Sequence, residues 1–126
     1  MDYSSGVWQF EGQGFVPNGT SGTTIAQIHR ASHGATTLIL RIYNGNMMYY
    51  ARDKIEKNLY NRWFRLNIIH DVDGGQLMVF IDGIQKFQTA DKGPGNLYFK
   101  CGVYAARSNI SYYMESRWRD IKIFKK

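Results

Sequence analysis

Cysteine is nearly absent from this sequence of 126 residues, which contains Cys101 alone. An intramolecular disulfide is therefore excluded, and so is a zinc site built from two or four cysteines. No apolar run approaches the ~20 residues that cross a bilayer, so we expect no membrane span. The first residues, Met-Asp-Tyr-Ser-Ser, include neither the basic nor the apolar segment of a signal peptide. The native signal sequence is thus expected to be absent from this chain.

Motifs for cofactors and common catalytic sites are also lacking. The sequence has no Gly-rich phosphate loop before a helix, no HExxH and no serine nucleophile elbow. The acidic turn at 71–75 lacks the terminal Glu of a calcium loop. We therefore expect no metal site and no cofactor.

What is present is apolar, aromatic and basic. Hydrophobic residues make up 44% and aromatic residues 15%, and the formal charge is +6. The length predicts a single domain over residues 1–126. A basic protein attracts polyanions, which include nucleic acid, anionic lipid and acidic polysaccharide. Lys and Arg are scattered and no RNA-binding signature occurs, so we expect no nucleic-acid partner.

Short alternating runs, broken by Gly, Asn, Asp and Pro, replace any long amphipathic helix. They predict an all-β, two-sheet antiparallel β-sandwich of the jelly-roll type. Asn44-Gly45 and Asp82-Gly83 predict tight hairpins, and Gly12 with Gly14 predict a bulge in the first strand. A charged connector with a helical turn is expected at 53–61. The predicted strands are 6–16, 23–29, 36–43, 47–52, 62–70, 76–81, 84–89, 97–104, 112–118 and 121–124.

Three of these strands carry polar side chains on the face opposite their apolar one. Period-two alternation places Thr23, Ile25, Gln27 and His29 on one face. It places Tyr98, Lys100 and Tyr104 on one face of a second strand, and Arg41 with Tyr43 on a third. These side chains could have no functional role and simply form solvent-exposed strand faces. The functional interpretation is a sheet face that binds an acidic sugar, because Arg and Lys pair with carboxylates. Such a face would also suit eliminative cleavage of a uronate polymer.

The sequence resembles the alginate-lyase-type jelly-roll polysaccharide lyases, which have a concanavalin-like fold. The resemblance is carried by Gln27-Ile28-His29 and by Tyr98-Phe99-Lys100-Cys101-Gly102-Val103-Tyr104. The stretches 4–12, 60–67 and 114–118 are similar to the plant citrate-binding-protein branch of that superfamily.

The resemblance implies catalytic roles for Gln27, His29 and Tyr104. Gln27 would neutralise the uronate carboxylate, while His29 and Tyr104 would serve as base and acid. Lys100 would bind the substrate, and Tyr98, Arg41 and Tyr43 are further substrate-binding candidates from their strand faces.

The family pattern is not matched everywhere. Family members carry an Arg-x-Glu-x-Arg strand upstream of the matched part, so we expect that strand and its Arg to be missing from the groove. The open edge would invite a homodimer. Ala106 stands where a Gln usually follows the last Tyr of the second motif by two positions, and Tyr113 stands where many citrate-binding members have a second Cys.

Two functions therefore remain open. One is a lyase that binds and cleaves a uronate-containing acidic polysaccharide by β-elimination. The other is a non-catalytic module that binds a glycan or a small carboxylate such as citrate. The resemblance also implies a secreted, extracellular or vacuolar location, and the sequons at Asn18 and Asn109 agree with a secretory origin.

Overall fold

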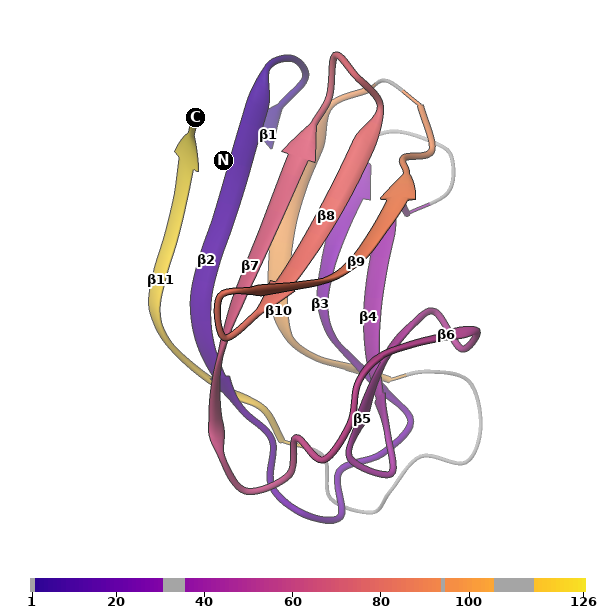
Figure 1. The fold of residues 1–126 in the computed structure, drawn as a ribbon, viewed down its shortest axis with the longest axis vertical. Coiled ribbons are helices and arrows are strands. Elements are labelled where there is room, and N and C mark those ends of the chain that lie inside the picture. The colour runs from indigo at the N-terminus through magenta and orange to yellow at the C-terminus, as the bar shows by residue number, and fades with distance from the viewer. Residues whose placement is uncertain (1, 31–35, 94, 106–114) are drawn as a thin grey trace.

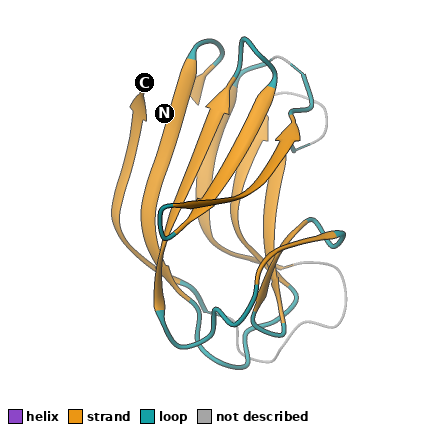
Figure 2. Cartoon of the chain, in the orientation of Figure 1, coloured by secondary structure: helices purple, strands orange, loops and turns teal. Residues whose placement is uncertain are grey.

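Two antiparallel sheets face each other in a sandwich, as predicted (Figure 1, Figure 2). The structure, a computed structural model, describes residues 2–30, 36–93, 95–105 and 115–126, with the side chains of 2 and 103–105 left out. No helix occurs among these residues. Sheet A has the strand order β1-β10-β3-β4-β5-β6, and sheet B has the order β11-β2-β7-β8-β9. The strands are β1 (Asp2–Tyr3), β2 (Val7–Phe15), β3 (Thr23–Arg30), β4 (Leu38–Tyr43), β5 (Asn46–Tyr49), β6 (Asp53–Glu56), β7 (Trp63–Asp71), β8 (Gln76–Ile81), β9 (Ile84–Ala90), β10 (Leu97–Ala105) and β11 (Arg117–Lys125).

The core lies between the sheets and follows the alternation of the sequence. In β4, β7 and β8 every second residue is buried. Each apolar side chain among them stabilises the fold by about 1.5–3 kcal/mol relative to an exposed one. The intervening residues form two outer faces, one on each sheet. The inward set from these three strands is Leu38, Leu40, Ile42, Phe64, Leu66, Ile68, His70, Leu77, Val79 and Ile81.

The connector expected at 53–61 is instead partly a strand, and that prediction is wrong. β6 pairs with β5 and continues sheet A, with Met47 opposite Glu56. Ile55 is its buried residue at 6% exposure, in an otherwise charged stretch. Three of the four residues of β6 are charged, so its sequence shows no alternation of apolar and polar residues from which a strand could be predicted.

The chain ends in one strand where two were expected. β11 runs continuously from Arg117 to Lys125. A bulge between Arg119 and Lys122, with Asp120 at φ 55°, lies where a gap between two strands was expected. The start of the first of those predicted strands, 112–114, lies outside the described residues. The two-residue strand β1, which pairs Tyr3 with Leu97, was not predicted.

Gly12 and Gly14 do not form the expected bulge, because β2 pairs with β7 without interruption from Val7 to Phe15. Their role is to leave room for rings in the core. A Cβ on Gly14 would lie 2.9 Å from Cζ of Phe64 and 3.1 Å from the Trp118 ring. The indole of Trp118 therefore packs where other side chains on β2 would stand.

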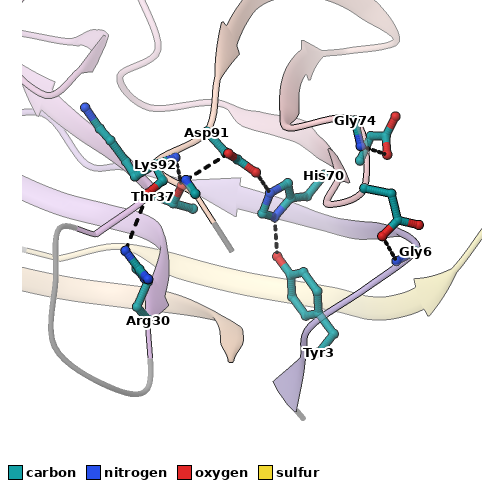
Figure 3. A network of polar contacts seen from close by, with 11 residues as sticks. Tyr3, Gly6, Arg30, Thr37, His70, Gly74, Asp91 and Lys92 are labelled. Carbon is teal, nitrogen blue, oxygen red and sulfur yellow. Dashed lines mark hydrogen bonds and ion pairs between the residues drawn. The ribbon is translucent and has the colours of Figure 1, made fainter. Parts of the chain in front are cut away.

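A buried polar triad joins the two sheets at one end of the sandwich (Figure 3). The Tyr3 hydroxyl lies 2.8 Å from Nδ1 of His70, and Nε2 of His70 lies 2.9 Å from Oδ2 of Asp91. The His70 side chain is 0% exposed and that of Asp91 is 8% exposed. Because a carboxylate only accepts, Nε2–H of His70 donates to Asp91. Burial lowers the pKa of His70, which favours the neutral ring, and in that form Nδ1 accepts from the Tyr3 hydroxyl. Both ring nitrogens are thus satisfied.

The triad extends toward the β3–β4 connection. Asp91 accepts a hydrogen bond from the backbone N–H of Gly93 at 3.0 Å. The next residue along the loop, Lys92, donates its backbone N–H to the hydroxyl of Thr37 at 2.8 Å. The loop after β9 is thereby fixed against the start of β4, beside the polar face of sheet A.

Candidate functional site

The register of sheet A brings four of the predicted site residues together on its outer face. Lys100 of β10 lies directly opposite Gln27 of β3, and Tyr98 lies opposite His29. Side chains opposite each other on neighbouring strands lie about 5 Å apart. Their chain neighbours Ile28 and Leu97 are buried on the inward face.

His29 is oriented by two neighbours. Its Nδ1 lies 3.3 Å from the hydroxyl of Thr36, and its ring meets that of Tyr98 edge-on at 5.3 Å between centroids. The hydroxyl of Tyr50 in turn donates to the carbonyl of Thr36. These contacts fix Nδ1 and leave Nε2 without a hydrogen bond within the described part of the chain.

The charge of this face favours an anionic ligand. The row Lys100–Gln27–Ile39 and the next row, Thr24–Arg41–Met48–Lys54, contain three cations and no carboxylate. The Gln27 amide makes no hydrogen bond to the described residues, so its N–H groups can serve a ligand. An amide beside an ammonium is suited to hold a carboxylate group.

Two bulges alter the face at one end. Ile25 was expected beside Gln27 but is buried at 0% exposure, because the register between β3 and β4 shifts between Thr24 and Ala26. That prediction is wrong, and Thr24 takes the outward position instead. A second shift lies in β10 between Cys101 and Tyr104. The backbone of Tyr104 lies opposite Thr24, while its side chain lies outside the described part of the structure.

Arg41 and Tyr43 differ in their distance from the cluster. Arg41 stands in the row of Thr24, and its Nε donates to the Thr24 hydroxyl at 3.4 Å. Tyr43 pairs with Asn46 at the end of the β4–β5 hairpin. It is four residues along β4 from Ile39, the partner of Gln27, which corresponds to about 13 Å. Arg41 thus adjoins the cluster and Tyr43 lies well beyond it.

The sequence did not point to Thr36, which contacts His29, or to Tyr50, which contacts Thr36. Tyr50 adopts a left-handed backbone with φ 54° just after β5. Arg52 and Lys92 lie over its ring, at 5.6 and 5.5 Å from the centroid. Burial raises the pKa of the Tyr50 phenol, an effect that the charges of Arg52 and Arg41 oppose. The only sequence signal is a second consecutive tyrosine, which strand alternation cannot place.

The described residues contain no group of three or more His, Cys, Asp or Glu side chains that could hold a metal ion. They also contain no helix that is long and apolar enough to cross a membrane. Cys101 is half-buried, and burial raises the pKa of its thiol.

The fold and the face define a class: antiparallel β-sandwiches with a cationic, amide-bearing and phenol-bearing surface on one sheet. The chain belongs to the alginate lyase family, whose model matches residues 1–125. Among characterised relatives, a citrate-binding protein from Hevea brasiliensis is 54% identical over 124 residues, which cover 98% of this chain. The chain spans about half of that relative, 52% of its length.

Solved structures confirm the jelly-roll fold. The alginate lyase from Corynebacterium sp. matches with a TM-score of 0.79 and 17% identity over 100% of this chain and 62% of its own. The alginate lyase AlgAT5 of polysaccharide lyase family 7 matches with a TM-score of 0.77 and 16% identity, over 100% of this chain and 63% of its own. At these identities the match concerns the fold.

Proposed function

We propose that the outer face of sheet A binds a uronate-containing acidic polysaccharide and cleaves it by β-elimination. The observation that carries this proposal is the register that sets Lys100 and Tyr98 directly opposite Gln27 and His29. Membership of the alginate lyase family supports it.

The binding step follows from charge and hydrogen bonding. A uronate residue presents a carboxylate, which Lys100 attracts and the Gln27 amide hydrogen-bonds. Arg41, in the adjoining row, would pair with the carboxylate of the next sugar. Tyr98 offers a ring against a pyranose face and a hydroxyl at its edge.

The chemical step uses His29 and Tyr104 as base and acid. With Nδ1–H donating to the Thr36 oxygen, the free Nε2 of neutral His29 accepts the C5 proton. The electron pair of the C5–H bond forms the C4=C5 double bond, and the C4–O bond breaks. Tyr104 gives its phenolic proton to the departing O4. Proton transfer from His29 to Tyr104 through solvent restores both groups.

A second candidate is a binding module without catalysis, specific for citrate or another small carboxylate. The 54% identity to a citrate-binding protein favours it. The same cations and amide would serve, because citrate is a tricarboxylate and needs no base at C5.

One set of assays separates the two candidates. The protein is incubated with alginate, polyglucuronate and polygalacturonate while the absorbance of the unsaturated product is followed, and citrate and oligouronate binding are measured by calorimetry. Product formation that Tyr104→Phe abolishes, with binding retained, supports the lyase. Saturable binding without product on any polymer would refute the lyase and support the binding module.

A charge variant with a matched control tests the location of the site. Lys100→Ala should weaken oligouronate or citrate binding about tenfold, the loss of one charge-assisted hydrogen bond. Lys57→Ala removes the same charge from an exposed position before β7 and should leave affinity unchanged. Equal effects of the two variants would mean that binding follows net charge and not this face.

We further propose a secreted, extracellular or vacuolar location and a homodimer formed through the edge of sheet A. β1 covers only Leu97 and Tyr98 of β10, and no other described strand pairs with that edge. Unpaired backbone groups on an edge strand favour pairing with a second chain. Sedimentation of a dimer that dissociates when Phe99→Pro is introduced would support this assembly, whereas a parent protein that sediments as a monomer would exclude it.

A further inference from the structure

The outer face of sheet B is hollowed, on the side of the sandwich opposite the proposed catalytic face. Three neighbouring cavities of about 460, 290 and 230 Å³ lie along it, and Arg65 lines all three. Strands β2 and β7 form the middle of this face. The site residues that the family resemblance implies, and those of the proposed function, all lie on sheet A.

The register arranges the polar side chains of this face as a grid. Gln9, Glu11 and Gln13 of β2 lie opposite Ile69, Asn67 and Arg65 of β7. Asn67 is in turn opposite Phe80 of β8. All of these except Gln13 line the largest cavity, with Ile69 and Phe80 as its apolar part.

The polar groups of the largest cavity are open to a ligand. The side chains of Gln9, Glu11, Asn67 and Arg65 make no hydrogen bond or ion pair to the described residues. Two amides, a carboxylate and a guanidinium therefore offer donors and acceptors within one small area. A ligand that fits must itself alternate donors and acceptors, as the hydroxyl groups of a sugar do.

An aromatic side chain borders the neighbouring cavity. The guanidinium of Arg119 lies 3.8 Å from the centroid of the Trp63 ring, and its Nε donates to Oε1 of Gln13 at 2.8 Å. The ring of Phe15 meets Trp63 at 5.4 Å between centroids. Fixed in this way, Trp63 provides a rigid apolar surface beside the amides.

We infer that the outer face of sheet B is a second glycan-binding site and that its ligand is a neutral oligosaccharide. Charge complementarity distinguishes it from sheet A. The rows of Lys100 and Arg41 on sheet A contain cations and no carboxylate. On sheet B the charged side chains that line the three cavities balance: the carboxylates are Glu11, Asp82 and Asp120, and the cations are Arg65, Lys122 and Lys126. A face of balanced charge does not attract a polyanion, and its carboxylates accept hydrogen bonds from sugar hydroxyls. A protein partner is disfavoured, since charged residues are depleted at the centre of protein interfaces.

The test is a titration of the isotopically labelled chain followed by nuclear magnetic resonance. Cellohexaose, laminarihexaose, mannohexaose and xylohexaose serve as neutral probes, and hexaguluronate as the acidic one. We expect at least one neutral hexasaccharide to shift the side-chain amide signals of Gln9, Gln13 and Asn67 and the indole signal of Trp63. The shifts should saturate, and the affinity should not change between low and high salt.

Two variants and a matched control locate the binding. Asn67→Leu should weaken the neutral sugar about tenfold, which is the loss of two hydrogen bonds. Gln9→Leu should weaken binding of the neutral sugar several-fold. It serves as the test variant if Asn67→Leu does not fold. Gln88→Ala on β9 keeps the wild-type affinity, because Gln88 bonds to Gln85 and Gln76 outside the cavities.

Three results would overturn the inference. One is that none of the four neutral sugars moves these signals. Another is that hexaguluronate alone moves them, which would make the surface a polyanion site. The third is that a neutral sugar binds to Asn67→Leu and to Gln9→Leu as tightly as it binds to the parent protein.

Discussion

The triad of Tyr3, His70 and Asp91 allows a quantitative prediction, because each partner can be removed separately. Asp91→Ala leaves the buried Nε2–H of His70 without its acceptor. An unsatisfied buried donor costs about 1–3 kcal/mol, and the lost bond was to a charged group, so we expect the free energy of unfolding to fall by about 2–4 kcal/mol. Asp91→Asn keeps an oxygen at the same place and should cost about 1 kcal/mol.

Tyr3→Phe removes only the hydroxyl that donates to Nδ1. The ring stacking against Trp8 and Phe99, at 5.5 and 5.4 Å between centroids, is retained. We therefore expect a loss of about 1 kcal/mol. Asp91 and Tyr3 bond to the same imidazole ring, so their effects should be coupled. We expect the loss of stability in the double variant to differ by about 0.5–1 kcal/mol from the sum of the two single losses.

The same residues predict how stability depends on pH. Burial lowers the pKa of His70, although the hydrogen bond and charge of Asp91 and the charge of Asp71 oppose this. Below pH ~6.5 the unfolded chain binds a proton that the folded state resists. Stability should therefore fall as the pH decreases from about 6.5 toward the folded pKa. Asp91→Asn removes the opposing charge and should extend the loss to lower pH.

Urea unfolding followed by tryptophan fluorescence, at several pH values, measures these quantities. The conservative substitution Lys57→Gln, exposed and far from the triad, serves as the control. The reasoning is refuted if Asp91→Ala and Asp91→Asn are equally stable, or if His70→Phe retains the full pH dependence below pH ~6.5.

Three further predictions concern packing, the proposed site and the thiol. Gly14→Ala should lower the free energy of unfolding by about 1–3 kcal/mol, because its Cβ would lie 2.9 Å from the Phe64 ring; equal urea midpoints for variant and parent would contradict this. Thr36→Val should reduce kcat for polymer cleavage about tenfold through His29 orientation while oligouronate affinity stays constant, and an unchanged kcat would remove Thr36 from the mechanism. Because burial raises the pKa of Cys101, its thiol should react with an aromatic disulfide reagent at least about tenfold more slowly in the folded chain than in urea; equal rates would show it to be exposed.

The predicted cluster of Gln27, His29, Tyr98 and Lys100 needed only strict alternation and the correct pairing of two strands. Both hold in the register from Leu97 to Cys101. Alternation failed at Ile25, where a bulge turns an apolar side chain inward. Strict alternation placed Ile25 on a polar face beside Thr, Gln and His, and this mismatch in polarity could have indicated the bulge.

Other features lie beyond sequence patterns because they depend on tertiary contacts. Thr36, which contacts His29, and Tyr50, which contacts Thr36, lie just outside strands β4 and β5, where no periodicity applies. The inward position of His70 could be read from its spacing after Leu66 and Ile68, but its partners Tyr3 and Asp91 are distant in sequence. β6 shows the same limit, since a single inward Ile55 cannot define a period.

The contact of Trp118 with Gly12 and Gly14 has an evolutionary consequence. The space for the indole exists because two positions of the neighbouring strand carry no side chain. A larger residue at 14 becomes acceptable only when a smaller one replaces Trp118, and neither change is favourable first. In diverging relatives we therefore expect these positions to change together, and a tryptophan at 118 to predict a glycine at 14.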